Sequence, residues 1–194
     1  MRTFVLATAN RHKADEMRAL LGRLDFEVLE RPSAVADVDE TEDTLEGNAI
    51  LKARALVEAT GHAAIADDTG LFVDALGGRP GVLSARYAGH DATYELNVEK
   101  LLIEMREVPD EKRSASFRTV ICVAFPDGST TVVDGVLRGS ITREPRGSNG
   151  FGYDSVFAVG TEGQTLAEMS AEEKNAMSHR AIALLALAQS LGSN

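Results

Sequence analysis

TFVLATANRHK, residues Thr3 to Lys13, passes from a short apolar run through a polar loop into an amphipathic segment that reaches Leu21. Thr3 to Ala7 suits a buried strand, and Arg11 to Leu21 suits a helix with one apolar face. The stretch therefore predicts a strand–loop–helix unit, which is the building block of α/β folds.

The chain beyond this unit continues the alternation of strand and helix. Phe26 to Leu29 suits a second strand, and Asn48 to Thr60 (NAILKARALVEAT) is rich in strong helix formers and is followed by Gly61 as a stop signal. Ala63 to Ala66 then suits another buried strand. The first third of the chain therefore predicts an α/β fold.

Two long β-rich runs lie in the second half, from Ser116 to Phe125 and from Thr130 to Thr142, and they flank the hairpin signal Pro126-Asp127-Gly128. A hairpin pairs its strands antiparallel, so we expect a mixed central sheet and not a purely parallel one. Two further segments suit helices, Asp91 to Glu107 and Ala171 to Leu191, the second preceded by the capping box Ser170-Ala-Glu-Glu173.

Length and charge limit the classes of protein to consider. With 194 residues, 44% of them hydrophobic, the chain suits a single domain over residues 1–194, with two lobes. There are 30 acidic and 20 basic residues, a formal net charge of −10, which argues against non-specific binding to nucleic acid or to an anionic membrane. A polyanionic ligand would need a local group of cations or a metal ion.

The single cysteine and the hydropathy pattern predict the cellular setting. Cys122 lies in the apolar run TVICVAF, so we expect a buried reduced thiol and no intramolecular disulfide. The first ten residues turn polar too soon for a signal-peptide core, and no 18 apolar residues follow one another. These features predict a soluble, unprocessed, cytoplasmic protein.

The first candidate site is TANRHK, at the start of the first predicted helix. Free amides at a helix amino terminus favour anions, and three basic residues in the motif add positive charge for a phosphate. The glycines of a Walker loop are missing. The alternative is that Asn10 caps the helix and that the basic side chains are solvated: Arg11, His12 and Lys13.

The second candidate is the acidic loop VDETED, Val38 to Asp43. A solvated loop is the more common role for such a run of charges. A cation such as Mg²⁺ could still recruit one of these carboxylates, because Mg²⁺ takes one or two protein carboxylates together with water and phosphate oxygens.

The third candidate is AIADDTG, Ala64 to Gly70, in which a buried strand is expected to end at Asp67 and Asp68. Ligands of open α/β sheets bind beyond the carboxyl ends of strands. Neighbouring residues of a strand point to opposite faces, so we expect at most one of the two carboxylates to meet a substrate directly. The alternative is that one or both cap the following turn.

Two glycine-rich segments add further candidates. In GGRPGVLSARYAG, residues 77–89, we favour a structural role for Ser84 and a ligand role for Arg86. GSNGFGYD, residues 147–154, offers two aromatic rings on which a base could stack and the carboxylate of Asp154 to read the N–H groups of the base. The alternative is that at least one ring packs into the core.

EEKNAMSHR, residues 172–180, is the last candidate. On one unbroken helix, Lys174, His179 and Arg180 would point in different directions. A break at Ser178 would instead place His179 and Arg180 at a helix amino terminus, which suits an anion or a carbonyl acceptor.

These motifs, in this order and near these spacings, resemble the inosine/xanthosine triphosphate pyrophosphatase family, the house-cleaning hydrolases of non-standard purine nucleotides. The resemblance extends from Thr8 to Arg180. It implies an elongated α/β fold with a central mixed sheet, two lobes around a nucleotide-binding cleft, a homodimer and a Mg²⁺ cofactor. It also implies hydrolysis of ITP, dITP and XTP to the monophosphate and pyrophosphate.

The resemblance assigns roles to individual residues. Glu40 and Asp68 correspond to the metal ligands, and Asp68 also to the proton acceptor. The remaining matches are substrate contacts: Thr8, Ala9, Asn10, Arg11, His12 and Lys13 for the triphosphate, Thr69, then Phe151, Gly152, Tyr153 and Asp154 for the base, and Lys174, His179 and Arg180. Three positions depart from the family pattern: Ala9 in place of a common glycine, Asn149 within the glycine run, and Ser155 where proline is frequent.

Two other readings of the sequence stay open. The chain could be a pyrophosphatase of related fold that acts on pyrimidine or modified nucleotides, such as the Maf-like group, although FGYD and SHR speak against it. It could also be a nucleotide-sensing or RNA-binding module without catalysis, which its acidity and the retained Glu40 and Asp68 disfavour.

Overall fold

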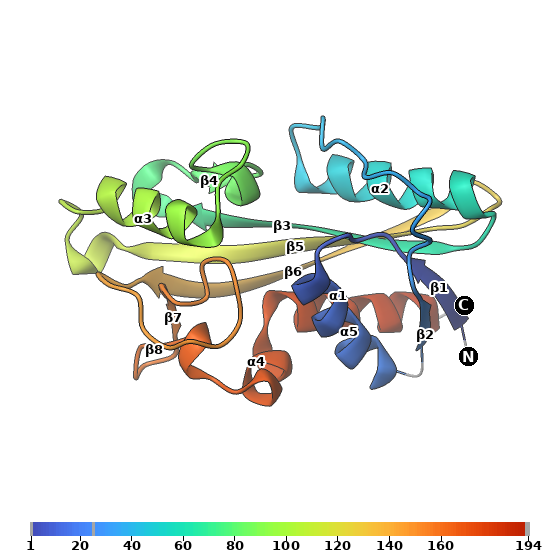
Figure 1. Cartoon of the computed structure of the whole chain (residues 1–194). Coiled ribbons are helices and arrows are strands. Elements are labelled where there is room, and N and C mark those ends of the chain that lie inside the picture. The colour runs from blue at the N-terminus through green and yellow to red at the C-terminus, as the bar shows by residue number, and fades with distance from the viewer. Residues whose placement is uncertain (1, 25, 193–194) are drawn as a thin grey trace. The chain divides into compact units, whose positions relative to one another are not determined.

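The computed structural model describes residues 2–24 and 26–192 and has a mixed α/β architecture (Figure 1). Within these residues, eight strands form one sheet in the order β2-β1-β3-β5-β6-β7-β8, with β4 paired to β3. The predicted α/β class and mixed sheet are confirmed. The strands are β1 (Arg2–Leu6), β2 (Phe26–Leu29), β3 (Ala64–Val73), β4 (Pro80–Gly81), β5 (Ser114–Ala124), β6 (Thr130–Ile141), β7 (Phe157–Val159) and β8 (Gln164–Thr165).

Five α-helices occur in the described residues. The chain divides into two compact units, of which unit 1 comprises residues 1–68, 119–135 and 179–194, and unit 2 comprises residues 69–118 and 136–178. Strands β3, β5 and β6 contribute residues to both units. The helices are α1 (Arg11–Gly22), α2 (Leu45–Thr60), α3 (Tyr94–Glu104), α4 (Ala171–Met177) and α5 (His179–Gly192).

Helices cover both faces of the sheet in unit 1. Strand β1 pairs in parallel with β2 and with β3. Phe4, Leu6 and Ile65 pack with apolar residues of α1 and α5, whereas Val5 and Ala64 pack with α2. Because successive strand residues face opposite sides, α1 and α5 lie on one face and α2 on the other, as Figure 1 shows.

Strand β3 passes through both aspartates. The prediction that this strand ends at Asp67 and Asp68 was wrong, because β3 continues from Ala64 to Val73. The alternation along the strand places Asp67 on the face of Ile65 and Asp68 on the opposite face. Each of the two buried carboxylates has cationic partners on its own face of the sheet, described below. These cations compensate the negative charges, so two adjacent aspartates can lie inside a buried strand.

Helix starts are set by capping side chains that the apolar pattern does not reveal. The helix predicted from Asn48 begins at Leu45, because the Thr44 hydroxyl accepts the Gly47 amide. The helix predicted over 91–107 is α3, Tyr94–Glu104, because Thr93 caps it in the same way.

The predicted carboxyl-terminal helix is interrupted. The capping box of Ser170 and Glu173 is confirmed at the start of α4, but Ser178 has extended backbone angles and separates α4 from α5. The break at Ser178 that the sequence left open is therefore real. His179 and Arg180 become the first two residues of a helix.

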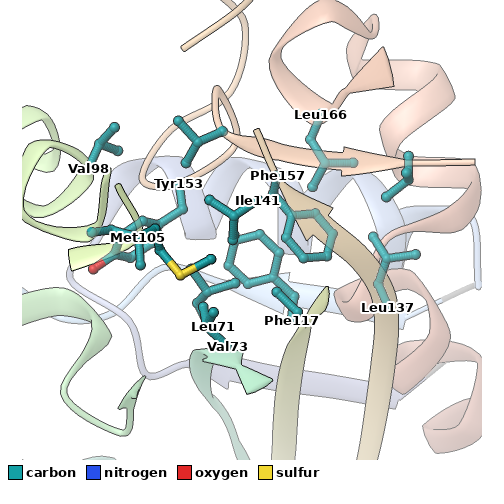
Figure 2. Packing of buried hydrophobic residues seen from close by; sticks show 14 of the residues in the cluster. Leu71, Val73, Val98, Met105, Phe117, Leu137, Ile141, Tyr153, Phe157 and Leu166 are labelled. Atoms are coloured by element: carbon teal, nitrogen blue, oxygen red, sulfur yellow. The ribbon is translucent and has the colours of Figure 1, made fainter. Parts of the chain in front are cut away.

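Unit 2 has its own apolar core (Figure 2). The rings of Phe117 on β5 and Phe157 on β7 lie 4.6 Å apart between centroids, and Tyr153 packs into the same cluster. Strand β7 pairs antiparallel with β6 and with β8. This core supports the glycine-rich loop of residues 147–154.

Two further predictions concern Cys122 and membrane association. Cys122 is buried in β5 as predicted, and burial raises the pKa of its thiol to about 11. None of the helices formed by residues 2–24 and 26–192 has the length and apolar character needed to cross a membrane.

Candidate active site

Asp67 and Asp68 of β3 contact different partners on the two faces of the sheet in unit 1. Asp67 is buried, and one of its oxygens, Oδ2, lies 3.3 Å from the Lys13 Nζ and 3.1 Å from an Arg180 guanidinium nitrogen. Burial by itself would raise the pKa of Asp67, but the charges of Lys13 and Arg180 outweigh it and hold the pKa far below its usual range. Asp67 is therefore a permanent anion.

Arg180, at the start of α5, forms ion pairs on both sides of its guanidinium. One terminal nitrogen donates to Asp67 and the other to Glu16 of α1. The side chain is only 1% exposed. A charge this deeply buried needs such compensation, so Glu16 and Asp67 together fix the guanidinium.

Asp68 faces α2 and is held there by two side chains one helical turn apart. The Lys52 Nζ lies 3.0 Å from Asp68 Oδ1, and the Asn48 amide donates to Oδ2 at 3.3 Å. The same Lys52 nitrogen lies 2.9 Å from a carboxylate oxygen of Glu40. Asn48 also exchanges hydrogen bonds with the backbone of Glu42, which ties the acidic loop to this site.

The acid–base properties of this cluster differ from those of Asp67. Burial, together with the negative charge of Glu40, raises the pKa of Asp68 even though Lys52 and Lys13 oppose the shift. Burial would also raise the pKa of Glu40, but Lys52 and Lys13 outweigh it and the pKa is lowered. Burial would lower the pKa of Lys52, and the charges of Asp68, Asp67 and Glu40 raise it instead. The environment thus shifts Asp68 toward its protonated form and Glu40 toward its charged form.

Glu40 and Asp68 form a donor set that suits Mg²⁺. Their oxygens both lie within hydrogen-bond distance of one nitrogen, so the two carboxylates converge. In the part of the chain that the structure describes, no group of three or more His, Cys, Asp or Glu side chains could hold a metal ion. A two-carboxylate set fits Mg²⁺, which completes its shell with water and phosphate oxygens, better than a cation that needs a closed protein cage.

The TANRHK loop is organised by Asn10. Its side-chain oxygen accepts the amides of His12 and Lys13 at 3.0 and 3.3 Å, so the helix cap expected in the alternative is confirmed, whereas Lys13 pairs with Asp67 and is not simply solvated. These two amides are therefore engaged within the protein. Any anion at this loop would be bound mainly by side chains, of which Lys13 lies in the Asp67 cluster while Arg11 and His12 are exposed.

The FGYD loop forms a second polar cluster, within unit 2. Asp154 accepts the Phe151 amide at 2.9 Å and pairs with Lys174, whose ammonium lies 4.9 Å from the centroid of the Phe151 ring. Gly150 has φ +73°, and a Cβ there would lie 2.1 Å from an Asp154 oxygen. The loop therefore needs glycine at this position to keep its carboxylate in place.

Tyr153 confirms the alternative that at least one ring of the FGYD loop packs into the core. Its ring is buried in the unit 2 core, and its hydroxyl donates to the Ser84 carbonyl at 2.9 Å. The Ser84 hydroxyl accepts the Leu71 amide and donates to the Gly81 carbonyl, which agrees with the structural role favoured for Ser84. Only Phe151, which is half-buried, remains as a stacking surface.

The structure gathers part of the predicted set within each unit. Unit 1 brings together Lys13, Glu40, Asp68 and Arg180, and unit 2 brings together Phe151, Asp154 and Lys174. Thr69 is half-buried in β3 and His179 is buried at the start of α5. The roles of all these residues as substrate contacts, metal ligands or catalytic groups stay predictions, as do the substrate contacts expected of Thr8, Ala9, Asn10, Arg11, His12, Arg86, Gly152 and Tyr153.

Sequence reasoning missed three residues of the unit 1 cluster: Glu16, Asn48 and Lys52. A signal was available for two of them. Asn48 and Lys52 are polar residues, four apart, on the side of α2 whose other members are apolar and buried. A polar pair on a buried helix face indicates a partner inside the protein.

With this geometry established, similarity to known proteins identifies the family. Residues 4–190 match the Ham1 family, and the chain belongs to it. A dITP/XTP pyrophosphatase from Thermoanaerobacter sp. (strain X514) is 49% identical over 94% of this chain and 93% of its own length. A dITP/XTP pyrophosphatase from Escherichia coli O157:H7 is 46% identical over 98% of both chains. The structure of a HAM1 protein from Coxiella burnetii has a TM-score of 0.89, with 42% identity and full coverage of both chains.

Proposed function

We propose that this protein hydrolyses the non-standard purine nucleoside triphosphates ITP, dITP and XTP to the nucleoside monophosphate and pyrophosphate, and so removes them from the nucleotide pool. Relatives that match nearly the whole chain are dITP/XTP pyrophosphatases. The observation that carries the proposal is the convergence of Glu40 and Asp68 beside the ammonium groups of Lys52 and Lys13.

Mg²⁺ is the cofactor of this proposal, with Glu40 and Asp68 as its protein ligands. When bound, it would offset negative charge on the phosphate oxygens. Lys13 adds a further cation for the triphosphate. A chain with a net charge of −10 needs a local group of cations to bind a polyanionic triphosphate, and the cationic side chains of unit 1 provide that group.

Asp68 is the catalytic residue of the proposal. Its carboxylate orients a water and accepts its proton as the water attacks the α-phosphorus, and pyrophosphate leaves. Asn48 of α2 donates to Oδ2 of this carboxylate and so helps to fix its orientation before substrate binds.

Base recognition is assigned to the unit 2 cluster. Phe151 offers a ring for stacking, and Asp154 and Lys174 offer an acceptor and a donor. Hypoxanthine and xanthine carry a 6-oxo acceptor and an N1 donor, whereas adenine presents the reverse pattern, so ATP would leave buried polar groups unpaired. We retain Thr69, His179 and Arg180 as further predicted nucleotide contacts.

A substrate panel tests the proposal. We expect pyrophosphate release from ITP, dITP and XTP that is much faster than from ATP or dUTP and that requires Mg²⁺. GTP is the informative comparison, because it shares the 6-oxo group and differs by a 2-amino group. Preference for dUTP would favour a pyrimidine pyrophosphatase, and tight, salt-dependent oligonucleotide binding without turnover would favour an RNA-binding module.

We also propose that the protein acts as a homodimer in the cytoplasm. The dimer depends on the family resemblance, and the location depends on the single cysteine and the hydropathy pattern of the sequence. Light scattering coupled to size-exclusion chromatography would test the first: a mass near 20.7 kDa would indicate a monomer and twice that mass the dimer.

A further inference from the structure

The ammonium group of Lys52 forms ion pairs with both carboxylates that we assign to the metal. Its nitrogen is 2.9 Å from Glu40 and 3.0 Å from Asp68, and the side chain is 12% exposed. Two carboxylates that converge in a partly buried site repel each other unless a cation lies between them. In the nucleotide-free chain, that cation is Lys52.

The position of Lys52 is built into α2 and is not a chance surface contact. The residue lies one turn after Asn48, which binds the other oxygen of Asp68, and the same side of the helix buries Ala49, Ala53 and Leu56. Lys13 is the nearest alternative cation, but its nitrogen lies 3.3 Å from Asp67.

We propose that Lys52 is an internal counterion that competes with the divalent metal for Glu40 and Asp68. Its competition keeps the affinity of the nucleotide-free enzyme for the metal low. The metal then arrives together with the phosphates of the nucleotide, whose negative charge offers Lys52 an alternative partner. This inference rests on the proposed function only in assigning Glu40 and Asp68 to a metal, and it adds an order of binding.

The test measures metal binding without nucleotide. Mn²⁺ is titrated into the full-length protein, and free Mn²⁺ is followed by electron paramagnetic resonance at constant ionic strength. Replacing the ammonium by an apolar chain of similar length in Lys52→Met should tighten Mn²⁺ binding about tenfold, because one positive charge next to the dication is removed. Arg54→Met, which removes an exposed charge two residues further along α2, should leave the affinity unchanged.

Double variants test whether the tighter Mn²⁺ binding of Lys52→Met depends on Glu40. Adding Glu40→Gln to Lys52→Met should abolish the tighter binding, whereas adding Asp39→Asn, an exposed neighbour, should preserve it. Equal or weaker Mn²⁺ binding by folded Lys52→Met would overturn the proposal, as would a gain that survives Glu40→Gln.

The wild-type protein supplies a measurement that does not depend on the folding of a variant. Its affinity for Mn²⁺ without nucleotide should be weaker than the affinity of Mn²⁺ for ITP alone in the same buffer, and a tighter value would contradict an internal counterion. The two proposals fail differently. Absence of ITP hydrolysis by the wild type refutes the proposed function, whereas ITP hydrolysis with unchanged Mn²⁺ affinity in Lys52→Met refutes only the counterion.

Discussion

Asp67 and Arg180 form an ion pair of 3.1 Å in which neither side chain is more than 1% exposed. The same Asp67 oxygen lies 3.3 Å from Lys13, and the other end of the guanidinium meets Glu16. Four side chains of alternating charge therefore connect α1, β3 and α5 inside unit 1. Removal of any member leaves an opposite charge buried with less compensation.

Asp67→Asn should destabilise the protein by about 3–5 kcal/mol, because the amide keeps the shape of the carboxylate but leaves Arg180 under-compensated. Urea unfolding followed by circular dichroism measures the loss. Asp15→Asn is the matched control, since Asp15 is exposed and pairs with the partly exposed Arg18 at 3.4 Å, so its cost should stay below about 1 kcal/mol. A similar cost for both variants would contradict a structural role for the buried pair.

Asp68→Asn should lower kcat for ITP by about 100-fold or more, because an amide cannot accept a proton from water. The far-ultraviolet circular dichroism spectrum should not change. Asp43→Asn, an exposed carboxylate of the acidic loop, controls for the loss of one negative charge. A wild-type rate of pyrophosphate release from Asp68→Asn would remove this residue from catalysis.

Lys13→Ala should reduce kcat/KM for ITP by about 10- to 100-fold, the range expected for one charge-assisted hydrogen bond to a phosphate. Arg180 still pairs with Asp67, but Lys13 also compensates this aspartate, so far-ultraviolet circular dichroism must show that the variant is folded. Lys112→Ala removes an exposed lysine and should have no effect. Unchanged kinetics in Lys13→Ala would exclude a direct contact with the triphosphate.

Cys122 should resist alkylation in the folded protein. Burial raises the pKa of its thiol to about 11, so roughly one thiol in a thousand would be ionised at pH 8, and the side chain is not exposed. Iodoacetamide labelling followed by mass spectrometry should therefore show little modification at pH 8 without denaturant and complete modification in urea. Rapid labelling of the native protein at pH 8 would contradict this burial.

The strands and helices that the sequence predicted well are those with strong local patterns. The apolar runs at residues 3–7 and 26–29 and the hairpin signal at Pro126-Asp127-Gly128 correspond to β1, β2 and the β5–β6 connection. The strand at Ala64 was predicted too short, because two adjacent aspartates are local signals for a loop. Only the cations of α1, α2 and α5 make those aspartates compatible with a buried strand.

The candidate site likewise contains residues that the sequence identified and residues that only the folded structure revealed. Motif order alone identified Lys13, Glu40 and Asp68 as functional candidates. It did not identify Lys52, which contacts Glu40 and Asp68 from positions 12 and 16 residues away in the sequence. Motif order also did not identify Glu16, because its partner Arg180 is 164 residues away in the sequence.

The sequence by itself determined the α/β class, the mixed sheet, the family resemblance and the opposite orientation of Asp67 and Asp68, because periodicity and motif order are properties of the chain. Tertiary structure alone decided what each aspartate meets. Asp67 became the anion of a buried ion-pair chain, and Asp68 a carboxylate of raised pKa beside Glu40 and Lys52. The physical reason is that burial and the distance to charges on other elements set the behaviour of an ionisable group, and both arise only when the chain has folded.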